Sequence, residues 1–529
     1  MDLRGRFDPP VRFAAVREYL ARCVRIDSRT LAVFRVFVGV LIVADLLLRS
    51  RNFSFFYTED GVVPRSLAMD VTPDYAFSVY YLTTSSTLIA ALFVLQGLIA
   101  LQLIVGYKTR VATVLSFLFV VSLDHHNPFV LSYADTLFRL LLFWAIFLPL
   151  GERWSIDAAH RTRAPRPHVS SIASAFILSQ MVYMYVVNGY HKSQSELWTG
   201  GEATPLIFGL DDMTFFLAGI MREFPTLLQY GGLTWYYMLL FAWLLILLPG
   251  RPRMMFVAMF AIAHLSFGLT VRIGAFPYVA MAGLTLFLQG QFWNDAAFLA
   301  RAVGIETDRI SATSSDLARL AASVPDYRFD SDRQLAVREN VYTFVVAIIA
   351  VTVLLVATVS LLQVAGAVDD DVGHDEEIET VAASLNIDQP PWSVFAPTPR
   401  TTDRYYVFAA QTASGEQIDV YNDGRSLSYD RPYDELQQQY DTYRERFYMN
   451  SVRRAGSDGE TSNVYAEHLC TTWPEEHGEE LTHINMYQVS ETITIDTIAE
   501  PSDRDQSVRL IRKHGCDGHE PEEFAPPDR

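Results

Sequence analysis

The stretch VNGYHKSQSELW, residues 187–198, ends an apolar run that begins at Ile172. This run approaches the roughly 20 residues that an α-helix needs to cross a bilayer. Lys192 and Trp198 are therefore expected at the membrane edge, where lysine and tryptophan are both common anchors. An alternative is that Lys192 faces a polar chamber, and the rest of the chain bears on that choice.

Apolar runs of similar length recur before residue 370, and half of the chain is hydrophobic (50%). They predict an all-α polytopic membrane domain of about nine transmembrane helices. The predicted spans are residues 31–48, 82–105, 111–123, 134–150, 172–188, 234–248, 254–269, 275–289 and 341–362. Residues 203–229 are apolar but interrupted by charges and a proline, so we expect an interfacial or re-entrant segment there.

Arginines indicate how the chain is oriented in the membrane. Residues 1–29 contain seven arginines and no cleavable signal pattern, which predicts a cytoplasmic N terminus. The short loops predicted to lie inside are also basic. With nine crossings, the C-terminal domain is then extracytoplasmic, and the chain is a multi-pass protein of the cell membrane.

Charge separates the chain into a membrane part and a tail. Residues 367–529 carry 34 acidic and 13 basic side chains, whereas the whole chain has a net charge of −18. An acidic surface argues against nucleic acid as a partner. The predicted domains are a cytoplasmic amphipathic N-terminal segment (1–29), a transmembrane domain (30–295), a cytoplasmic helical segment (296–340), a last transmembrane helix (341–366), an acidic linker (367–390) that is a solvated spacer rather than a metal site, and an extracytoplasmic soluble domain (391–529).

The tail has the pattern of a small α+β or β-rich domain. Residues 405–410 and 417–421 predict a hairpin, residues 434–447 a helix, and residues 484–489 and 492–498 further strands. Cys470 and Cys516 either form a disulfide or remain free thiols. No cysteine or histidine spacing predicts a metal site. The surface of this domain either receives a protein or peptide substrate or only covers the membrane part.

Several ionisable residues fall inside the predicted spans, where a charge costs at least ~2.5–3.5 kcal/mol, and Arg272 falls just beyond one. Asp135 and Arg139 are four residues apart and can pair on one helix face. Apart from Arg35, the set lies toward the outer half of the membrane, which predicts a polar chamber there. The alternatives are ion pairs that only hold helices together and, for His264, a packing role. The set is Arg35, Asp45, Asp135, Arg139, His264 and Arg272.

Four segments, in order, resemble the HTTM (horizontally transferred transmembrane) domain family, which is related to vitamin K-dependent gamma-carboxylase. The resemblance covers roughly residues 20–295, and the fourth segment is the most specific. The segments are Phe34-Arg35-Val36-Phe37-Val38-Gly39 with Asp45, Asp135 through Trp154-Ser155-Ile156-Asp157, Gly189 to Trp198, and His264 followed by Ile273-Gly274-Ala275-Phe276-Pro277-Tyr278-Val279.

The resemblance implies a chemistry in which a lysine deprotonates a reduced quinone of the vitamin K or menaquinol type. In the carboxylase, oxygen then converts the quinol into a strong base, and CO2 adds to a glutamate carbanion. Lys192 matches that lysine and His264 matches a histidine near the quinone. A base must be neutral, and a desolvated site disfavours an ammonium. The resemblance further implies that Tyr190, Phe276 and Tyr278 contact the cofactor and that Asp135, Arg139, Asp45, Arg35 and Arg272 support the site.

The chain departs from the carboxylase at two site positions and in one spacing. The carboxylase has a histidine where this chain has Ala134 or Asp135, and an asparagine where it has Phe267. The interval from Lys192 to Trp198 is one residue longer. The main alternative to quinol-dependent oxidation or carboxylation is a non-enzymatic membrane protein for peptide maturation, export or immunity. A transporter is disfavoured because the charges do not continue to the inner side and no inverted repeat is evident.

Overall fold

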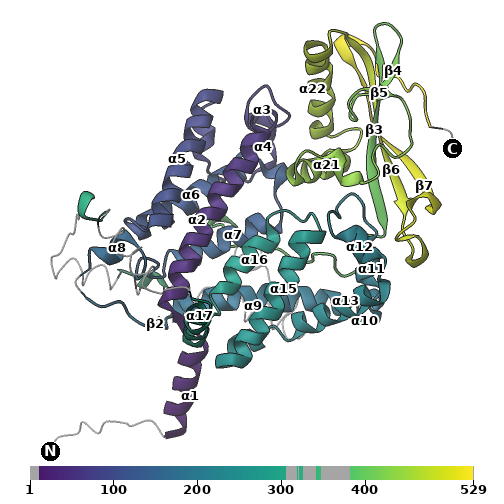
Figure 1. The fold of residues 1–529 in the computed structure, drawn as a ribbon. Helices are drawn as coiled ribbons and strands as arrows, with labels where there is room; N and C mark the ends of the chain where they lie inside the picture. Colours follow the sequence, from purple (N-terminus) through teal and green to yellow (C-terminus); the bar gives the residue numbers. More distant parts are fainter. Residues whose placement is uncertain are drawn as a thin grey trace, which may run out of the picture.

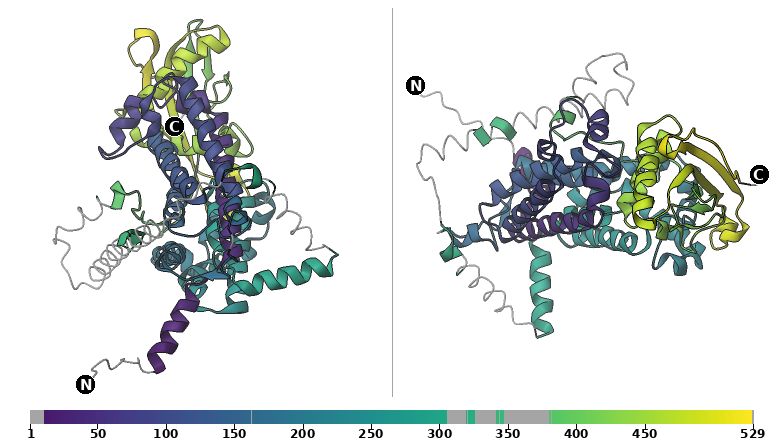
Figure 2. Two further views of the ribbon diagram at one scale, coloured as in Figure 1. Left: turned by 90° about the vertical axis from the view of Figure 1, so that its left-hand side faces the viewer. Right: turned by 90° about the horizontal axis from the view of Figure 1, so that it is seen from above.

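The computed structural model describes residues 11–161, 163–304, 319, 321–325, 341–342, 344–346, 380 and 382–527. The part up to Ala302 is helical, and the part after residue 401 contains a sheet with helices (Figure 1). The sheet and its helices lie at one end of the helical part in all three views (Figure 2). Residues 367–379 and 381 of the predicted acidic linker, and most of the predicted last span, 341–362, lie outside the described residues, whereas residues 382–390 of the linker are described.

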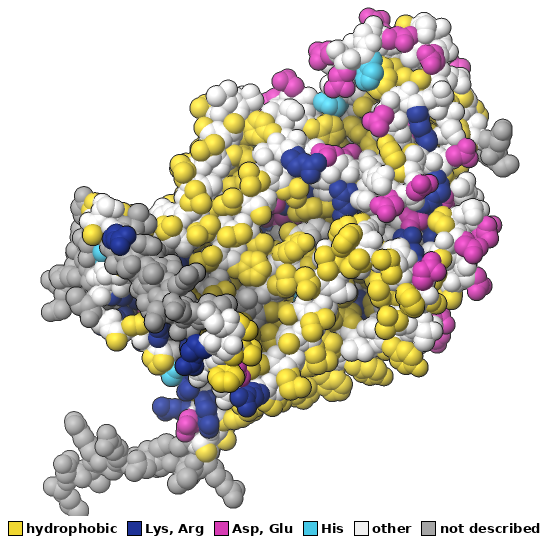
Figure 3. Space-filling model, viewed as in Figure 1, with side chains coloured by type: hydrophobic (Ala, Val, Ile, Leu, Met, Phe, Trp, Pro, Cys, Tyr) yellow, Lys and Arg dark blue, Asp and Glu magenta, His cyan; other side chains and the backbone are white. Residues whose placement is uncertain are grey.

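Four of the described helices are long and apolar enough to cross a membrane: α2 (Ser28–Arg51), α5 (Ser86–Val105), α9 (Ile172–Ser193) and α15 (Gly250–Thr270). Many of their apolar side chains face outward, as shown by Leu47 (65% exposed), Leu98 (57%) and Ile262 (67%). Figure 3 shows hydrophobic side chains covering the helical part and acidic ones gathered on the C-terminal domain. The helical part is therefore a membrane region with several spans.

Shorter helices make up the rest of the helical part. The larger ones are α6 (Thr109–His126), α7 (Tyr133–Ala145), α13 (Pro225–Leu240), α16 (Phe276–Thr285) and α17 (Gly290–Ala302). The predicted span 234–248 is displaced, since α13 begins at Pro225, where the missing N–H of proline suits a first turn. The rest are α1 (Val11–Cys23), α3 (Phe53–Tyr57), α4 (Arg65–Val71), α8 (Ile156–Ala159), α10 (Glu196–Gly200), α11 (Ala203–Phe208), α12 (Ala218–Arg222), α14 (Leu244–Leu247), the 3-10 turns η1 (Val79–Leu82) and η2 (Pro128–Val130), and the paired strands β1 (Ile26–Asp27) and β2 (His168–Val169).

Local capping fixes where α7 begins. The Ser132 hydroxyl accepts the Ala134 N–H, and the Asp135 carboxylate in turn accepts the Ser132 backbone N–H at 2.8 Å. This reciprocal arrangement is a capping box, which satisfies N–H groups that a helix start leaves free. It also holds the Asp135 side chain at the end of α7 that faces the C-terminal domain.

The C-terminal domain is a five-stranded antiparallel sheet in the order β5-β4-β3-β6-β7. Its strands are β3 (Thr402–Thr412), β4 (Gln417–Asp419), β5 (Arg425–Ser426), β6 (Leu481–Thr492) and β7 (Gln506–Gly515), and its helices are α21 (Tyr443–Ala455) and α22 (Glu460–His477). The predicted hairpin is confirmed, with Gln411 opposite Gln417. Helices α21 and α22 lie on the side of the sheet toward the membrane region (Figure 1). Cys470 and Cys516 form a disulfide between α22 and the end of β7.

Two predictions for this domain are wrong. The predicted helix 434–447 begins only at Tyr443, because Thr442 is its N-cap, and the preceding residues form the 3-10 turn η3 (Leu436–Gln439). The predicted strand 492–498 ends at once in the 3-10 turn η4 (Ile495–Thr497), where Thr494 and Thr497 form a capping box. Short polar side chains that bond to their own backbone favour such turns over a strand.

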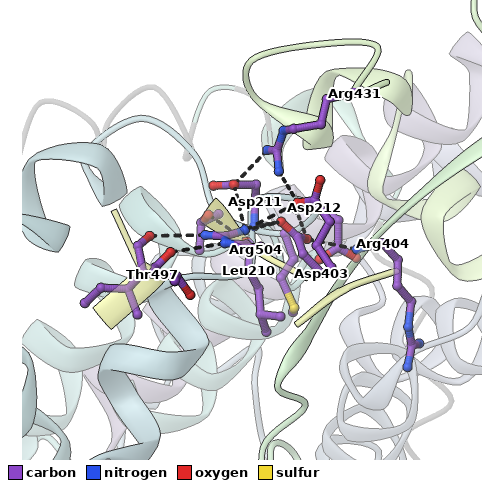
Figure 4. A network of polar contacts seen from close by, with 12 residues as sticks. Leu210, Asp211, Asp212, Asp403, Arg404, Arg431, Thr497 and Arg504 are labelled. Carbon is purple, nitrogen blue, oxygen red and sulfur yellow. Dashed lines mark hydrogen bonds and ion pairs between the residues drawn. The ribbon is translucent and has the colours of Figure 1, made fainter. Parts of the chain in front are cut away.

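A network of ion pairs joins the membrane region to the C-terminal domain (Figure 4). The Asp403 carboxylate accepts the backbone N–H groups of Asp211 and Asp212 at 2.8 and 2.9 Å. Arg504 lies 3.2 Å from both Asp211 and Asp403, and Arg431 lies 2.8 Å from Asp211. Asp211 and Asp212, which interrupt the apolar stretch 203–229, are therefore paired with arginines of the tail, Asp211 with Arg431 and Arg504 and Asp212 with Arg400.

Candidate functional site

Lys192 lies in the last turn of α9 and is almost fully buried, with 2% of its surface exposed. Its Nζ donates to the Val394 carbonyl at 2.6 Å and stands 4.0 Å from the centroid of the Trp198 ring. A carbonyl dipole and an aromatic face both attract an N–H donor. The amine is thus neither in solvent nor at the lipid surface, so the anchor interpretation does not fit its position.

Lys192 is covered by residues 389–395, which lie about 200 residues later in the sequence. We call this segment the strap. Asn188 Nδ2 donates to the carbonyls of Trp392 (2.7 Å) and Val394 (3.1 Å). Trp198 Nε1 donates to the Phe395 carbonyl at 2.8 Å. Trp392 and Phe395 have φ angles of 48° and 53°, a conformation that is strained for large side chains. The strap thus turns the carbonyls of Trp392, Val394 and Phe395 toward α9 and α10.

His264 is fully buried on α15 and is linked to α9 through a tyrosine. Tyr185 Oη lies 2.8 Å from His264 Nε2, while Nδ1 has no hydrogen-bond partner among the described residues. The rings of Trp235 and Phe276 surround the imidazole, with centroids 5.5 and 6.0 Å away. The histidine therefore has one polar contact within an aromatic shell.

Lys192 and Tyr185 line the same cavity, which has a volume of about 500 Å³ and which we call the Lys192 cavity. They are seven residues apart, or two turns of α9, and therefore lie on one face of the helix. Phe276 and Trp198 also line it. Through Tyr185, His264 is placed directly behind the wall of the cavity that contains the lysine.

A second cavity, of about 530 Å³, lies beside the first, and we call it the Asp124 cavity. Val271, which follows α15, lines both. Six charged side chains also line the Asp124 cavity, from α2, α6, α7, α21 and the α15–α16 connection. They are Asp45, Arg49, Asp124, Asp135, Arg272 and Arg444.

These charges are densely paired. Arg49 lies 2.7 Å from Asp45, 3.1 Å from Asp124 and 3.2 Å from Asp135. Arg444 also pairs with Asp45 and with Asp135. Arg272 donates instead to the carbonyls of Gln437, Tyr440 and Asp441. Two arginines thus bridge three carboxylates that come from three different helices.

Sequence reasoning missed three of these residues. Asp124 follows the predicted span 111–123 but lies in the last turn of α6, where it is 1% exposed. Arg49 was placed past the end of the first span, although α2 continues to Arg51. Arg444 belongs to the acidic tail, and no local sequence pattern indicates that it enters the membrane region. A signal for Arg49 was available, because Asp45 lies four residues before it.

The predicted site residues separate into groups. Lys192 and Phe276 line the Lys192 cavity, with His264 behind it, whereas Asp45, Asp135, Arg272 and Tyr278 line the Asp124 cavity. Tyr190 is 56% exposed and lines neither cavity. The expected Asp135–Arg139 pair is wrong, because Asp135 pairs with Arg49 and Arg444 while Arg139 lies 3.0 Å from Asp388 of the tail.

Arg35 lies in the N-terminal half of α2, away from the end that carries Asp45 and Arg49. It is fully buried, and its guanidinium donates to the carbonyls of Leu150 (3.0 Å), Arg153 (3.1 Å) and Ile104 (3.3 Å). These carbonyls belong to helix ends and turns that lack a partner within their own segment. Arg35 therefore holds the turn after α7 to the end of α5 and does not contribute to either cavity.

Comparison with known proteins finds one family. The model of the HTTM domain matches residues 24–293, slightly more than half of the chain. No curated protein and no solved structure matches the chain. Both cavities are lined mainly by residues within the matched range, and the strap and Arg444 reach them from outside it. Within the described residues, no group of three or more His, Cys, Asp or Glu side chains could hold a metal ion.

Proposed function

Because the chain belongs to the HTTM-domain family, whose domain is also found in vitamin K-dependent gamma-carboxylase, we propose that it oxidises a membrane-dissolved quinol with Lys192 as the base. The observation that carries this proposal is the burial of the Lys192 amine at the wall of an apolar cavity. A cavity of about 500 Å³ is within the usual range for small-molecule sites.

The surroundings of Lys192 suit a proton acceptor. No ion pair holds the amine among the described residues, since its hydrogen bond is to the Val394 carbonyl. A neutral amine keeps that hydrogen bond with one N–H and still presents its lone pair. Oxidation of a bound quinol to the quinone would release two protons and two electrons, and oxygen would take up both electrons and two protons to become hydrogen peroxide. The Lys192 amine would take one of the quinol protons within hydrogen-bond reach of the hydroxyl.

Tyr185 and His264 give the same cavity a second route for a proton. The 2.8 Å contact between Tyr185 Oη and His264 Nε2 allows the hydroxyl to exchange a proton with the imidazole. Which nitrogen carries the hydrogen depends on the tautomer. In this proposal His264 acts through Tyr185, so it orients the hydroxyl and does not itself touch the quinol.

Entry from the lipid is supported by the outer wall of the Lys192 cavity. Leu227 of the α13 segment and Met259 and Ile262 of α15 line the cavity and are also 57%, 42% and 67% exposed. An apolar molecule dissolved in the membrane would therefore enter between α13 and α15. Carboxylation of a protein or peptide coupled to this oxidation would need a second substrate, for which the C-terminal domain lies next to the strap.

The test measures quinol oxidation by the full-length protein in native membranes supplied with reduced quinone and oxygen. It compares the unmodified protein with variants that each lack one lysine. The chain has three lysines, Lys108, Lys192 and Lys513. Lys192→Met keeps the length of the side chain but removes the base, so quinol oxidation should fall by about 100-fold or more. Lys513→Met is the matched control, because Lys513 is partly exposed on β7 and pairs with Glu523.

The outcomes separate the proposed functions. Unchanged oxidation in Lys192→Met membranes removes Lys192 from the mechanism. Absence of quinol oxidation in the unmodified protein favours the non-enzymatic alternative. Lys192→Ala should match Lys192→Met, because both lack the amine, and a difference between them would show that side-chain volume rather than the base decides the activity.

A further inference from the structure

The Asp124 cavity has a polar end and apolar walls. Phe37, Val40 and Leu41 of α2 and Phe138 of α7 contribute to the apolar walls, and the six charged residues contribute the polar part. Val40 and Tyr278 line the cavity and are also 47% and 43% exposed. The cavity therefore opens between α2 and α16, on the hydrophobic surface seen in Figure 3.

The charges of this cavity balance one another. Its lining contains the carboxylates of Asp45, Asp124 and Asp135 and the guanidinium groups of three arginines, so no net charge calls for a counter-ion. Arg139 lies near Asp124 but is matched by Asp388. A charged ligand would add an uncompensated charge in apolar surroundings, which is costly. The balance favours a ligand with a neutral head.

Two residues that line the cavity each have a polar atom that is buried without a hydrogen bond among the described residues. Asp124 Oδ1 is paired with Arg49, but Asp124 Oδ2 is buried without a hydrogen bond among the described residues. The Tyr443 hydroxyl is likewise buried without a hydrogen bond among the described residues. The two residues are only 1% and 7% exposed. Buried polar groups without partners are uncommon, and each needs an explanation.

The chemistry of these two atoms restricts the ligand. A carboxylate oxygen only accepts, so its partner must be a donor, whereas a tyrosine hydroxyl both donates and accepts. A hydroxyl group meets both requirements, because it can donate to Asp124 and accept from Tyr443. We propose that the Asp124 cavity binds a neutral, hydroxyl-bearing apolar molecule that enters from the bilayer between α2 and α16, at a site separate from the Lys192 cavity.

The test uses a photoreactive long-chain fatty alcohol with the full-length protein in lipid nanodiscs. The labelled residues are located by peptide mass spectrometry, and labelling is competed with unlabelled alcohol or with its methyl ether, which lacks the donor. Label is expected on α2 and α16, competed by the alcohol but at least about tenfold less well by the ether. Label that neither competitor reduces would show only contact with the bilayer and would overturn the proposal.

Variants then test the named atoms. Tyr443→Phe and Asp124→Asn should each weaken binding about tenfold, and Val40→Trp should block entry without touching either polar atom. Lys192→Met, in the other cavity, should leave the labelling unchanged while it removes quinol oxidation, so the two proposals fail separately. Full labelling in folded Tyr443→Phe and Val40→Trp proteins, or label confined to α13 and α15, would contradict the site.

Discussion

The Lys192 and Asp124 cavities are neighbours of nearly equal size, but they keep charged groups in apolar surroundings in different ways. In the Asp124 cavity, Arg49 and Arg444 bridge three carboxylates. In the Lys192 cavity, one amine is held by a carbonyl and an aromatic ring. Ion pairs fix charges in place, whereas an amine without a carboxylate partner remains free to change its protonation state. Charge pairing therefore stabilises the Asp124 cavity beside its proposed hydroxyl site, whereas the unpaired amine suits the proton transfer that we propose for the Lys192 cavity.

Both cavities are completed by the tail, which contributes differently to each. Arg444 of α21 enters the Asp124 cavity as a charge, while the strap enters the Lys192 cavity as backbone carbonyls. Removing a charge from a buried cluster leaves its partners unpaired, and this is costlier than removing one neutral hydrogen bond. The effects of mutation should rank accordingly.

The largest loss of stability is expected for Arg444→Met. The variant retains an apolar stem but leaves Asp45 and Asp135 with only Arg49 as a cation, so the free energy of unfolding should fall by about 3–5 kcal/mol. Thermal unfolding of the full chain in detergent measures the change. Adding Asp135→Asn to Arg444→Met should recover part of the loss. Equal stability of Arg444→Met and Lys192→Met would contradict the claim that only the Asp124 cavity depends on ion pairs.

A smaller effect should appear as a pH dependence at Glu445, next to Arg444 on α21. Burial raises the pKa of Glu445 to about 7, against the opposing effect of the Asp441 N–H and the Tyr421 hydroxyl, which both donate to it. The folded protein thus favours the protonated form. The stabilisation is present below the unfolded pKa near 4.5 and is lost as the pH rises to about 7.

Glu445→Gln measures this contribution. The variant should lose up to about 3 kcal/mol of the pH dependence between these limits, as judged from unfolding free energies at a series of pH values. Glu467→Gln is the control, because Glu467 is exposed on α22 of the same domain, and this variant should retain the wild-type profile. If the unfolding free energy of Glu445→Gln varied with pH as it does in the wild type, a group other than Glu445 would account for the pH dependence.

The smallest effect is expected for Asn188→Ala, which removes two hydrogen bonds from the strap. Neutral hydrogen bonds contribute about 0.5–1.5 kcal/mol each, so global unfolding should shift by about 1–3 kcal/mol while the strap itself opens more often. Hydrogen exchange of residues 389–397 should accelerate relative to β6. Asn450→Ala, which removes a single bond within α21, should leave the strap unchanged.

Much of the membrane region could be predicted from sequence because its signal is local. Apolar runs and basic turns placed α2, α5, α9 and α15 closely, and motifs such as Lys192 and His264 identified the family. The polar residues of the predicted chamber come from distant segments, but they divide between two cavities, and Arg35 and Arg139 line neither. Apolar runs and basic turns can be recognised in the sequence without knowledge of the tertiary fold.

The division into two cavities could not be predicted, because it depends on long-range contacts. Spacing favoured a pair between Asp135 and Arg139, but the arginine that enters from α21 and the Arg49 side chain take Asp135 instead. Likewise, no local pattern in the sequence of the strap shows that its carbonyls face Lys192. Contacts with residues distant in the sequence determine both the pairing of Asp135 and the position of the strap.

The most direct test of the account is a cryo-EM structure of the full-length protein with a reduced quinone analogue that oxygen cannot oxidise. The account predicts density for its ring in the Lys192 cavity, with a hydroxyl oxygen within about 3.2 Å of Lys192 Nζ. Density for the ring in the Asp124 cavity, or only on the outer lipid-facing surface, would contradict the assignment of proton transfer to Lys192.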